Sequence, residues 1–166
     1  MRLLLLAMAV IPLLAQTPHI RAAQEYFAEG TSALSKDQPD AAIKSFEKAI
    51  EIEPTFFEAR ELLIRTYRAL GKSLQEGAAI TEYLEIKPES TEYRIRLGQI
   101  LLAEKQPQKA LAQYSLVLRR EPDNPDGLLG FASAASAAGM QDRAAQALAR
   151  GRQKYPSDAR FRSAQP

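Results

Sequence analysis

Few residues in this chain could carry out catalysis. It has a single histidine, His19, and no cysteine, which excludes disulfides, thiol catalysis and zinc sites built on cysteine. Neither a G-x-x-x-x-G-K-S/T motif nor an H-E-x-x-H motif occurs. The acidic residues fall at helical positions expected to be exposed, and His19 lies near the N-terminus, a poor place for a general base. We therefore expect no enzyme, no metal site and no cofactor.

Charge is unevenly distributed along the chain. Residues 23–88 contain 8 Lys and Arg against 12 Asp and Glu, whereas residues 89–166 contain 12 against 8. The rear half includes a basic cluster that could neutralise phosphates: Arg143, Arg150, Arg152, Lys154, Arg160 and Arg162. No ladder of aromatic residues accompanies this cluster for base stacking. We expect helix-terminal charges and no nucleic-acid partner, with contact to an anionic partner or a lipid as the alternative.

The first residues have the pattern of a secretory signal. Arg2 precedes an apolar run that continues to Leu14 and ends in the small residue Ala15 before Gln16. The run is shorter than the roughly 20 apolar residues that span a bilayer. No cysteine follows it to carry a lipid anchor. We expect residues 1–15 to be cleaved and the mature protein to be periplasmic or secreted, without membrane insertion. An uncleaved anchor or a buried helix is the alternative.

Four prolines punctuate the rest of the chain at intervals of 34 residues. They are Pro54, Pro88, Pro122 and Pro156. A constant interval between helix-breaking residues indicates one structural unit repeated four times. Within each unit, apolar residues recur with helical spacing in two stretches separated by a turn. The pattern predicts an all-α fold with a lead-in over 16–22, four units over 23–156 (23–56, 57–90, 91–124 and 125–156), and a C-terminal tail over 157–166.

Local signals predict where these helices begin and end. Pro39 and Pro107 suit first helical positions, and Gly71 and Gly139 suit the turns inside the second and fourth units. Thr55 and Glu58 have the spacing of a capping box, Ser90 is a candidate N-cap, and Asn124 followed by Pro125 is a strong one. In the tail, Phe161 is expected to pack onto the fourth unit as a short, incomplete cap.

Small and large residues alternate at fixed distances before each proline. Counting back 24, 12, 8 and 5 residues gives Gly30, Ala42, Phe46 and Ala49 in the first unit and Gly98, Ala110, Tyr114 and Val117 in the third. The fourth unit has Ala132, Ala144, Leu148 and Gly151 at these places. This pattern resembles the tetratricopeptide repeat. The second unit departs from it at Ile64, Glu76 and Tyr83, so its helix pair is expected to be splayed or rotated.

The resemblance implies an α-solenoid, a superhelix of four helix-turn-helix repeats whose concave wall is built from the first helix of each repeat. In the family that wall grips peptides or helices. The corresponding positions include Phe27, Thr31, Glu61, Arg65, Arg68, Ile95, Gln99, Leu129 and Ser133. A groove that is apolar at Phe27, Ile95 and Leu129 and cationic at the two arginines would suit a peptide with a carboxylate. The chaperone-binding branch of the family uses a different set of residues, of which only Arg96 is matched, so chaperone-tail binding is not expected.

The predicted function is therefore that of a non-catalytic adaptor or scaffold that binds a protein or peptide. By analogy with exported bacterial relatives, a role in envelope or secretion assembly is expected. The alternative is a structural protein whose end repeats associate with each other in a homo-oligomer, aided by the acidic and basic halves.

Overall fold

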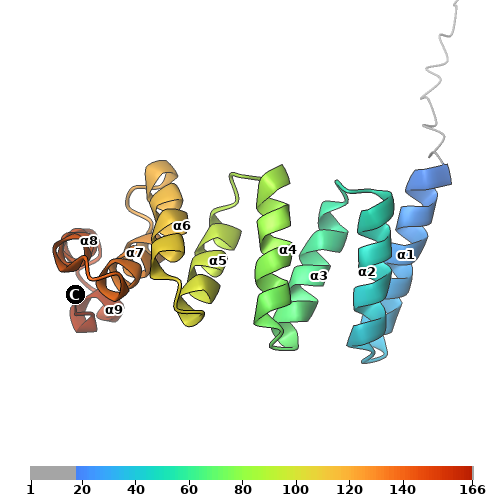
Figure 1. The fold of residues 1–166 in the computed structure, drawn as a ribbon, viewed down its shortest axis with the longest axis horizontal. Helices are drawn as coiled ribbons and strands as arrows, with labels where there is room; N and C mark the ends of the chain where they lie inside the picture. The colour runs from blue at the N-terminus through green and yellow to red at the C-terminus, as the bar shows by residue number, and fades with distance from the viewer. Residues whose placement is uncertain (1–17, 166) are drawn as a thin grey trace, which may run out of the picture. The chain divides into compact units, whose positions relative to one another are not determined.

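The computed structural model describes residues 18–165, and these residues form α-helices and no β-strand (Figure 1). The predicted signal segment, residues 1–15, lies outside them. The helices are α1 (Pro18–Ser35), α2 (Pro39–Ile52), α3 (Phe57–Ala69), α4 (Ser73–Ile86), α5 (Thr91–Ala103), α6 (Pro107–Arg120), α7 (Pro125–Ala137), α8 (Gln141–Lys154) and α9 (Ala159–Ser163). The structure confirms the predicted pairs of helices. The second helix of each pair ends just before one of the four prolines spaced 34 residues apart. None of the described helices is both long and apolar enough to cross a membrane.

The first helix of every repeat ends in the same way. A residue with positive φ follows it, at intervals of 34: Asp37 (55°), Gly71 (67°), Lys105 (57°) and Gly139 (77°). The backbone N–H of the next residue then reaches back five positions, as when Gln38 donates to Ala33 O at 2.9 Å and Gln106 to Leu101 O at 2.8 Å. This is the Schellman arrangement, which satisfies carbonyls at a helix end. The two predicted glycine turns are confirmed, and Asp37 and Lys105 hold the same conformation without being glycine.

The helix starts agree with the sequence in part. Pro39, Pro107 and Pro125 occupy first helical positions, and the Asn124 side chain accepts a hydrogen bond from the Gly127 N–H at 2.8 Å. The predicted capping box at Thr55 is wrong, because α3 begins two residues later and the Thr55 hydroxyl donates to the Glu53 carboxylate instead.

The described residues as far as Ala59 form one compact unit. Its core is made by α1 and α2, with Ala23, Ala42, Phe46 and Ala49 fully buried. Gly30 allows the two helices to approach closely, since a Cβ at this position would lie 2.5 Å from Cε1 of Phe46. The alternation of small and large residues in the sequence therefore sets the distance between paired helices.

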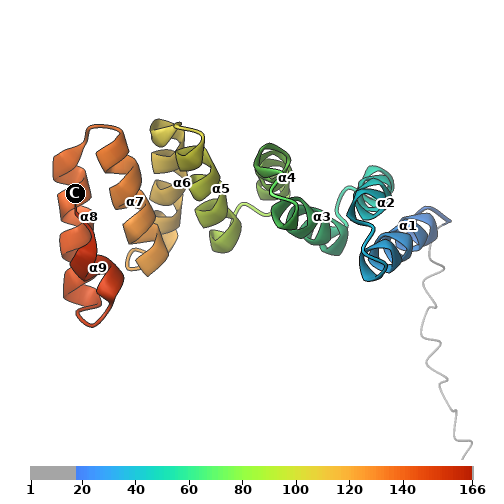
Figure 2. The same ribbon diagram turned by 90° about the horizontal axis from the view of Figure 1, so that it is seen from below.

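The second compact unit runs from Arg60 to the end of the described chain, from most of α3 to α9. Helices α5, α6 and α7 lie side by side, and α8 packs on α7 (Figure 2). Tyr114 of α6 is 1 % exposed and occupies the centre of this stack. A Cβ on Gly98 of α5 would lie 2.6 Å from its ring, and one on Gly130 of α7 would lie 2.1 Å from it. Burial raises the pKa of the Tyr114 hydroxyl to about 12.

The short helix α9 covers the last repeat. Phe161 of α9 is fully buried in the core formed with α7 and α8, and its ring stacks on Tyr155 with centroids 5.9 Å apart. It lies directly over Gly151, where a Cβ would approach it to 2.0 Å. Phe161 thus caps the fourth repeat as predicted.

Candidate interaction surface

Seven of the nine residues predicted to line a groove lie on α3, α5 and α7, the first helices of the repeats in the second compact unit. Arg65, Gln99 and Ser133 are exposed, on α3, α5 and α7 respectively. Ile95 and Leu129 are half-buried and pack against the hydrophobic core, so part of their surface serves stability. We call this set of seven residues the first-helix face: Glu61, Arg65, Arg68, Ile95, Gln99, Leu129 and Ser133.

Arg68 does not project freely from the first-helix face. Its Nε donates to the Glu76 carboxylate at 2.7 Å, and the Glu76 side chain is 1 % exposed. Arg96 of α5 binds the same carboxylate with two nitrogens, Nε to Oε1 and Nη2 to Oε2, both at 2.7 Å. Glu76 stands on α4 where the other repeats have alanine. One buried acid therefore joins the first helices of the second and third repeats.

The two arginines keep Glu76 ionised. Burial by itself would raise the pKa of this carboxyl, but the hydrogen bonds from Arg96 and Arg68 outweigh that effect and leave the pKa below its ordinary value. The same contact raises the pKa of the Arg96 guanidinium. The cluster is thus a carboxylate between two cations, with a net charge of one positive unit.

The other two residues that depart from the repeat pattern in the second repeat, Ile64 and Tyr83, also make specific contacts. Ile64 is fully buried. Tyr83 donates its hydroxyl to the Glu61 carboxylate at 2.8 Å, and its ring centroid lies 4.6 Å from that of Tyr93. Burial and the Glu61 carboxylate raise the pKa of Tyr83. Glu61, predicted to face a ligand, is therefore engaged within the protein.

The other two residues predicted to line the groove, Phe27 and Thr31, lie on α1 in the first compact unit. Phe27 is half-buried, with its ring centroid 4.9 Å from that of Phe56 and 5.9 Å from that of Phe46. The Thr31 hydroxyl donates to the Ala28 carbonyl at 2.9 Å. Near the start of α1, a hollow of about 270 Å³ is lined by Ile20, Ala23, Gln24, Glu53 and Phe56. Phe27 is thus part of an aromatic cluster that packs α1 against the end of α2.

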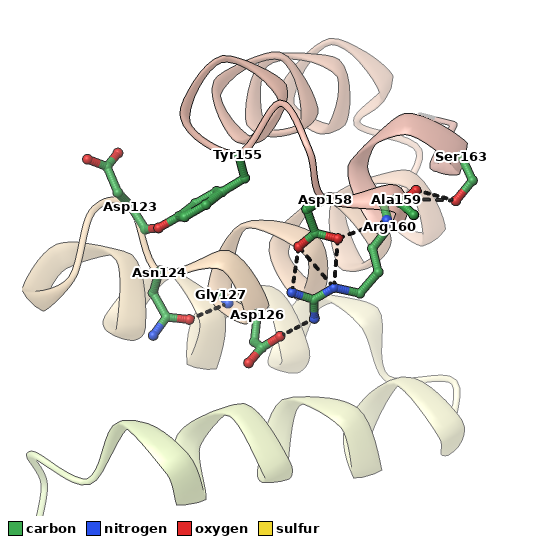
Figure 3. A network of polar contacts seen from close by, with 9 residues as sticks. All are labelled: Asp123, Asn124, Asp126, Gly127, Tyr155, Asp158, Ala159, Arg160 and Ser163. Atoms are coloured by element: carbon green, nitrogen blue, oxygen red, sulfur yellow. Dashed lines mark hydrogen bonds and ion pairs between the residues drawn. The ribbon is translucent and has the colours of Figure 1, made fainter.

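The basic cluster near the C-terminus is largely engaged in contacts within the protein. Arg160 bridges Asp158 and Asp126, at 2.8 and 2.6 Å (Figure 3). Arg152 donates to the carbonyls of Phe161 and Ala164, and Arg150 and Lys154 both bind Asp123. The Tyr155 hydroxyl donates to the Asp123 carbonyl. These contacts agree with the interpretation of the cluster as structural charge.

Within residues 18–165, no group of three or more His, Asp or Glu side chains is arranged to hold a metal ion. His19 is exposed in the first turn of α1. The sequence interpretation missed the Arg68–Glu76–Arg96 cluster, although Glu76 had been identified as a departure from the repeat pattern. A charged residue at a position that must be buried was the available signal, because such a charge requires partners nearby.

The fold and this surface define an all-α protein of helix-turn-helix repeats. Three models of the tetratricopeptide repeat match the chain, over residues 23–56, 76–125 and 101–165. The chain belongs to the tetratricopeptide repeat family. No curated protein matches its sequence significantly.

Solved structures resemble the fold at low sequence identity. A tetratricopeptide repeat protein from Parabacteroides merdae has a TM-score of 0.73 at 16 % identity, covering 86 % of this chain and 57 % of its own. MamA from Desulfovibrio magneticus, from residue 41 to its end, has a TM-score of 0.69 at 17 % identity, with 84 % and 79 % covered. YrrB, described as having an unusual peptide-binding site, has a TM-score of 0.69 at 20 % identity, with 84 % and 72 % covered. These likenesses concern the fold.

Proposed function

We propose that this protein is a non-catalytic scaffold that binds a protein or peptide on the first-helix face. The observation that carries the proposal is the composition of that face. It combines exposed polar residues, Arg65, Gln99 and Ser133, with the half-buried apolar side chains of Ile95 and Leu129. Binding surfaces of this kind place apolar anchors beside polar groups that fix orientation. The description of YrrB as a peptide-binding protein of the same fold supports the proposal.

We further propose that the chain acts in a bacterial envelope or in secretion assembly. The support is the signal-like start of the sequence, Arg2 followed by an apolar run and Ala15. Self-association remains the alternative, but Phe161 is fully buried and covers the core of the fourth repeat, which disfavours an apolar contact between end repeats there.

Site-specific photocrosslinking in the envelope fraction of the source organism tests the binding face. A photoreactive residue at Gln99 or Ser133 should crosslink the partner, whereas the same residue at Gln146 should not. Gln146 is a matched control because it is exposed on α8, the second helix of its repeat. Equal crosslinking from all three positions, or from Gln146 alone, would contradict the proposed face. A crosslinked product of two copies of this chain would establish the self-associating alternative.

A further inference from the structure

The Arg68–Glu76–Arg96 cluster places charge where the fold does not need it. The three alanines at the corresponding positions, Ala42, Ala110 and Ala144, are fully buried. Packing there is therefore complete without a charged group. Burying an ion pair seldom adds stability over apolar packing, because the desolvation penalty offsets the attraction between the charges. The cluster therefore calls for an explanation other than stability.

Glu76 leaves part of each guanidinium available. Arg68 contacts Glu76 through Nε, on one edge of the guanidinium, so Nη1 on the far side lies outside that contact. Arg96 uses the edge formed by Nε and Nη2, and its Nη1 makes only a long contact of 3.5 Å with Gln99. The side chains of Arg68 and Arg96 are 38 % and 31 % exposed, so a ligand can reach both.

Hydrogen bonds to Glu76 orient the arginines before any ligand arrives, two of them from Arg96 and one from Arg68. Arg96 has another acidic neighbour, Glu92, one turn earlier on α5, but its hydrogen bonds go to the buried Glu76. An arginine held by two charge-assisted hydrogen bonds has already lost much of its rotamer freedom. Binding a ligand to such a residue costs less conformational entropy than ordering a free surface arginine.

We propose that Arg68 and Arg96, oriented by the buried Glu76, bind a carboxylate of an acidic peptide on the first-helix face. This inference rests on the proposed peptide-binding function and specifies the chemistry of the ligand. The planar, forked donors of arginine match a carboxylate. The net positive charge of the cluster attracts it, and Arg65, exposed one turn earlier on α3, adds to the attraction. Glu76 acts as a positioning residue that does not touch the ligand.

The test measures binding of a fluorescein-labelled Gly/Ser peptide containing three Glu residues, by fluorescence anisotropy. The matched peptide with three Gln residues should bind at least tenfold more weakly. Arg68→Gln and Arg96→Gln should each weaken binding of the acidic peptide at least fivefold. Arg119→Gln removes the same charge elsewhere and should change the Kd less than threefold. Arg119 is suitable because it is exposed on α6, the second helix of its repeat.

Glu76→Gln distinguishes positioning from simple charge attraction. Removing this carboxylate makes the surface more positive, so attraction alone would tighten binding of the acidic peptide. Loss of orientation should instead weaken it at least threefold. Tighter binding by Glu76→Gln would overturn the proposal, as would equal binding of the acidic and amide peptides by the natural protein.

Arg96→Lys keeps the result interpretable if Glu76→Gln does not fold. Lysine keeps the charge but lacks the forked donors, so binding should fall at least fivefold, and an unchanged Kd would overturn the proposal. Inorganic phosphate and acetate are compared as competitors at equal ionic strength. Displacement by phosphate at much lower concentrations than acetate would mark a phosphate site and also overturn it. The crosslinking experiment does not depend on ligand charge, so it can succeed even if every acidic-peptide test fails.

Discussion

At the scale of single residues, the left-handed position that follows each first helix is occupied by three residue types, glycine in two repeats and aspartate and lysine in the others. Gly71 and Gly139 adopt it without steric cost, whereas Asp37 and Lys105 bring a Cβ into a conformation that L-residues avoid. Lys105→Gly should therefore raise the free energy of unfolding by about 1 kcal/mol, measured by urea denaturation. Asp37→Gly should gain less, because aspartate tolerates this region better. Gly71→Ala serves as the reverse control and should destabilise, and a stabilising Gly71→Ala would contradict the argument.

Glu76 makes a second residue-scale prediction possible, because its pKa in the folded protein is below the ordinary value of 4.5. A carboxyl with a lowered pKa stabilises the fold fully above its unfolded pKa, and this contribution is lost as the pH falls through the folded value. Glu76→Gln should lower the free energy of unfolding at pH 7 by about 2 kcal/mol, with a difference that shrinks below pH 4.5. Urea midpoints at pH 7 and in acid give the comparison.

Other acidic groups do not confuse that measurement. Hydrogen bonds from Lys154 and Arg150 lower the pKa of Asp123, and those from Arg160 lower that of Asp158, but both groups titrate in the natural protein and the variant alike. The difference between the two proteins therefore isolates Glu76. A difference that stays constant down to pH 3 would mean that the ionised form of Glu76 contributes nothing.

At the scale of elements, the five-residue helix α9 depends on one side chain. Phe161→Ala would leave a cavity between α9 and Gly151, and such truncations typically cost about 3–5 kcal/mol. The expected result is a lower melting temperature of the second unit and rapid proteolysis after residue 156. Arg162→Ala on the same helix is the matched control, since Arg162 is exposed and should change stability by less than about 0.5 kcal/mol. Equal stability of both variants would show that α9 is not a cap.

The elements were predictable from the sequence to the extent that local signals set them. The proline interval and the alternation of Gly30 with Phe46 predicted paired helices, because breakers and residue sizes act through the nearest turn or the facing helix. The start of α3 was not predictable in this way: Thr55 had two possible partners, Glu53 and Glu58, and only the structure decides between them. The arginine cluster could not be derived for a related reason. Arg96 lies 20 residues from Glu76, and the contact depends on how two repeats stack.

At the scale of the whole molecule, some charged residues hold the fold together and others are available to a partner, and counts of acidic and basic residues do not separate the two. The basic excess over residues 89–166 arises partly from Arg152 and Arg160, which hold the C-terminal cap, and from Arg150 and Lys154, which join α8 to Asp123 before α7. Because exposed ion pairs are weak and screened by salt, the expected effect of salt on this cap is small. The acidic and basic halves therefore say less about a partner than the Arg68–Glu76–Arg96 cluster does, in which both arginines are partly exposed.

The last prediction concerns export of the whole chain. The apolar run ends at Ala15, after which cleavage is expected. Leu13, the third residue before that cleavage site, is larger than a signal peptidase prefers at this position. When the full chain is produced in an export-competent bacterium, mass spectrometry of the periplasmic fraction should find a major product beginning at Gln16 with minor neighbours. Leu13→Ala should make the product more uniform, because a small side chain then stands at both recognition positions. Leu6→Arg interrupts the apolar run and should keep the uncleaved chain in the cytoplasm. An uncleaved natural chain in the membrane fraction would favour an N-terminal anchor instead, because no helix in residues 18–165 is long and apolar enough to cross a membrane.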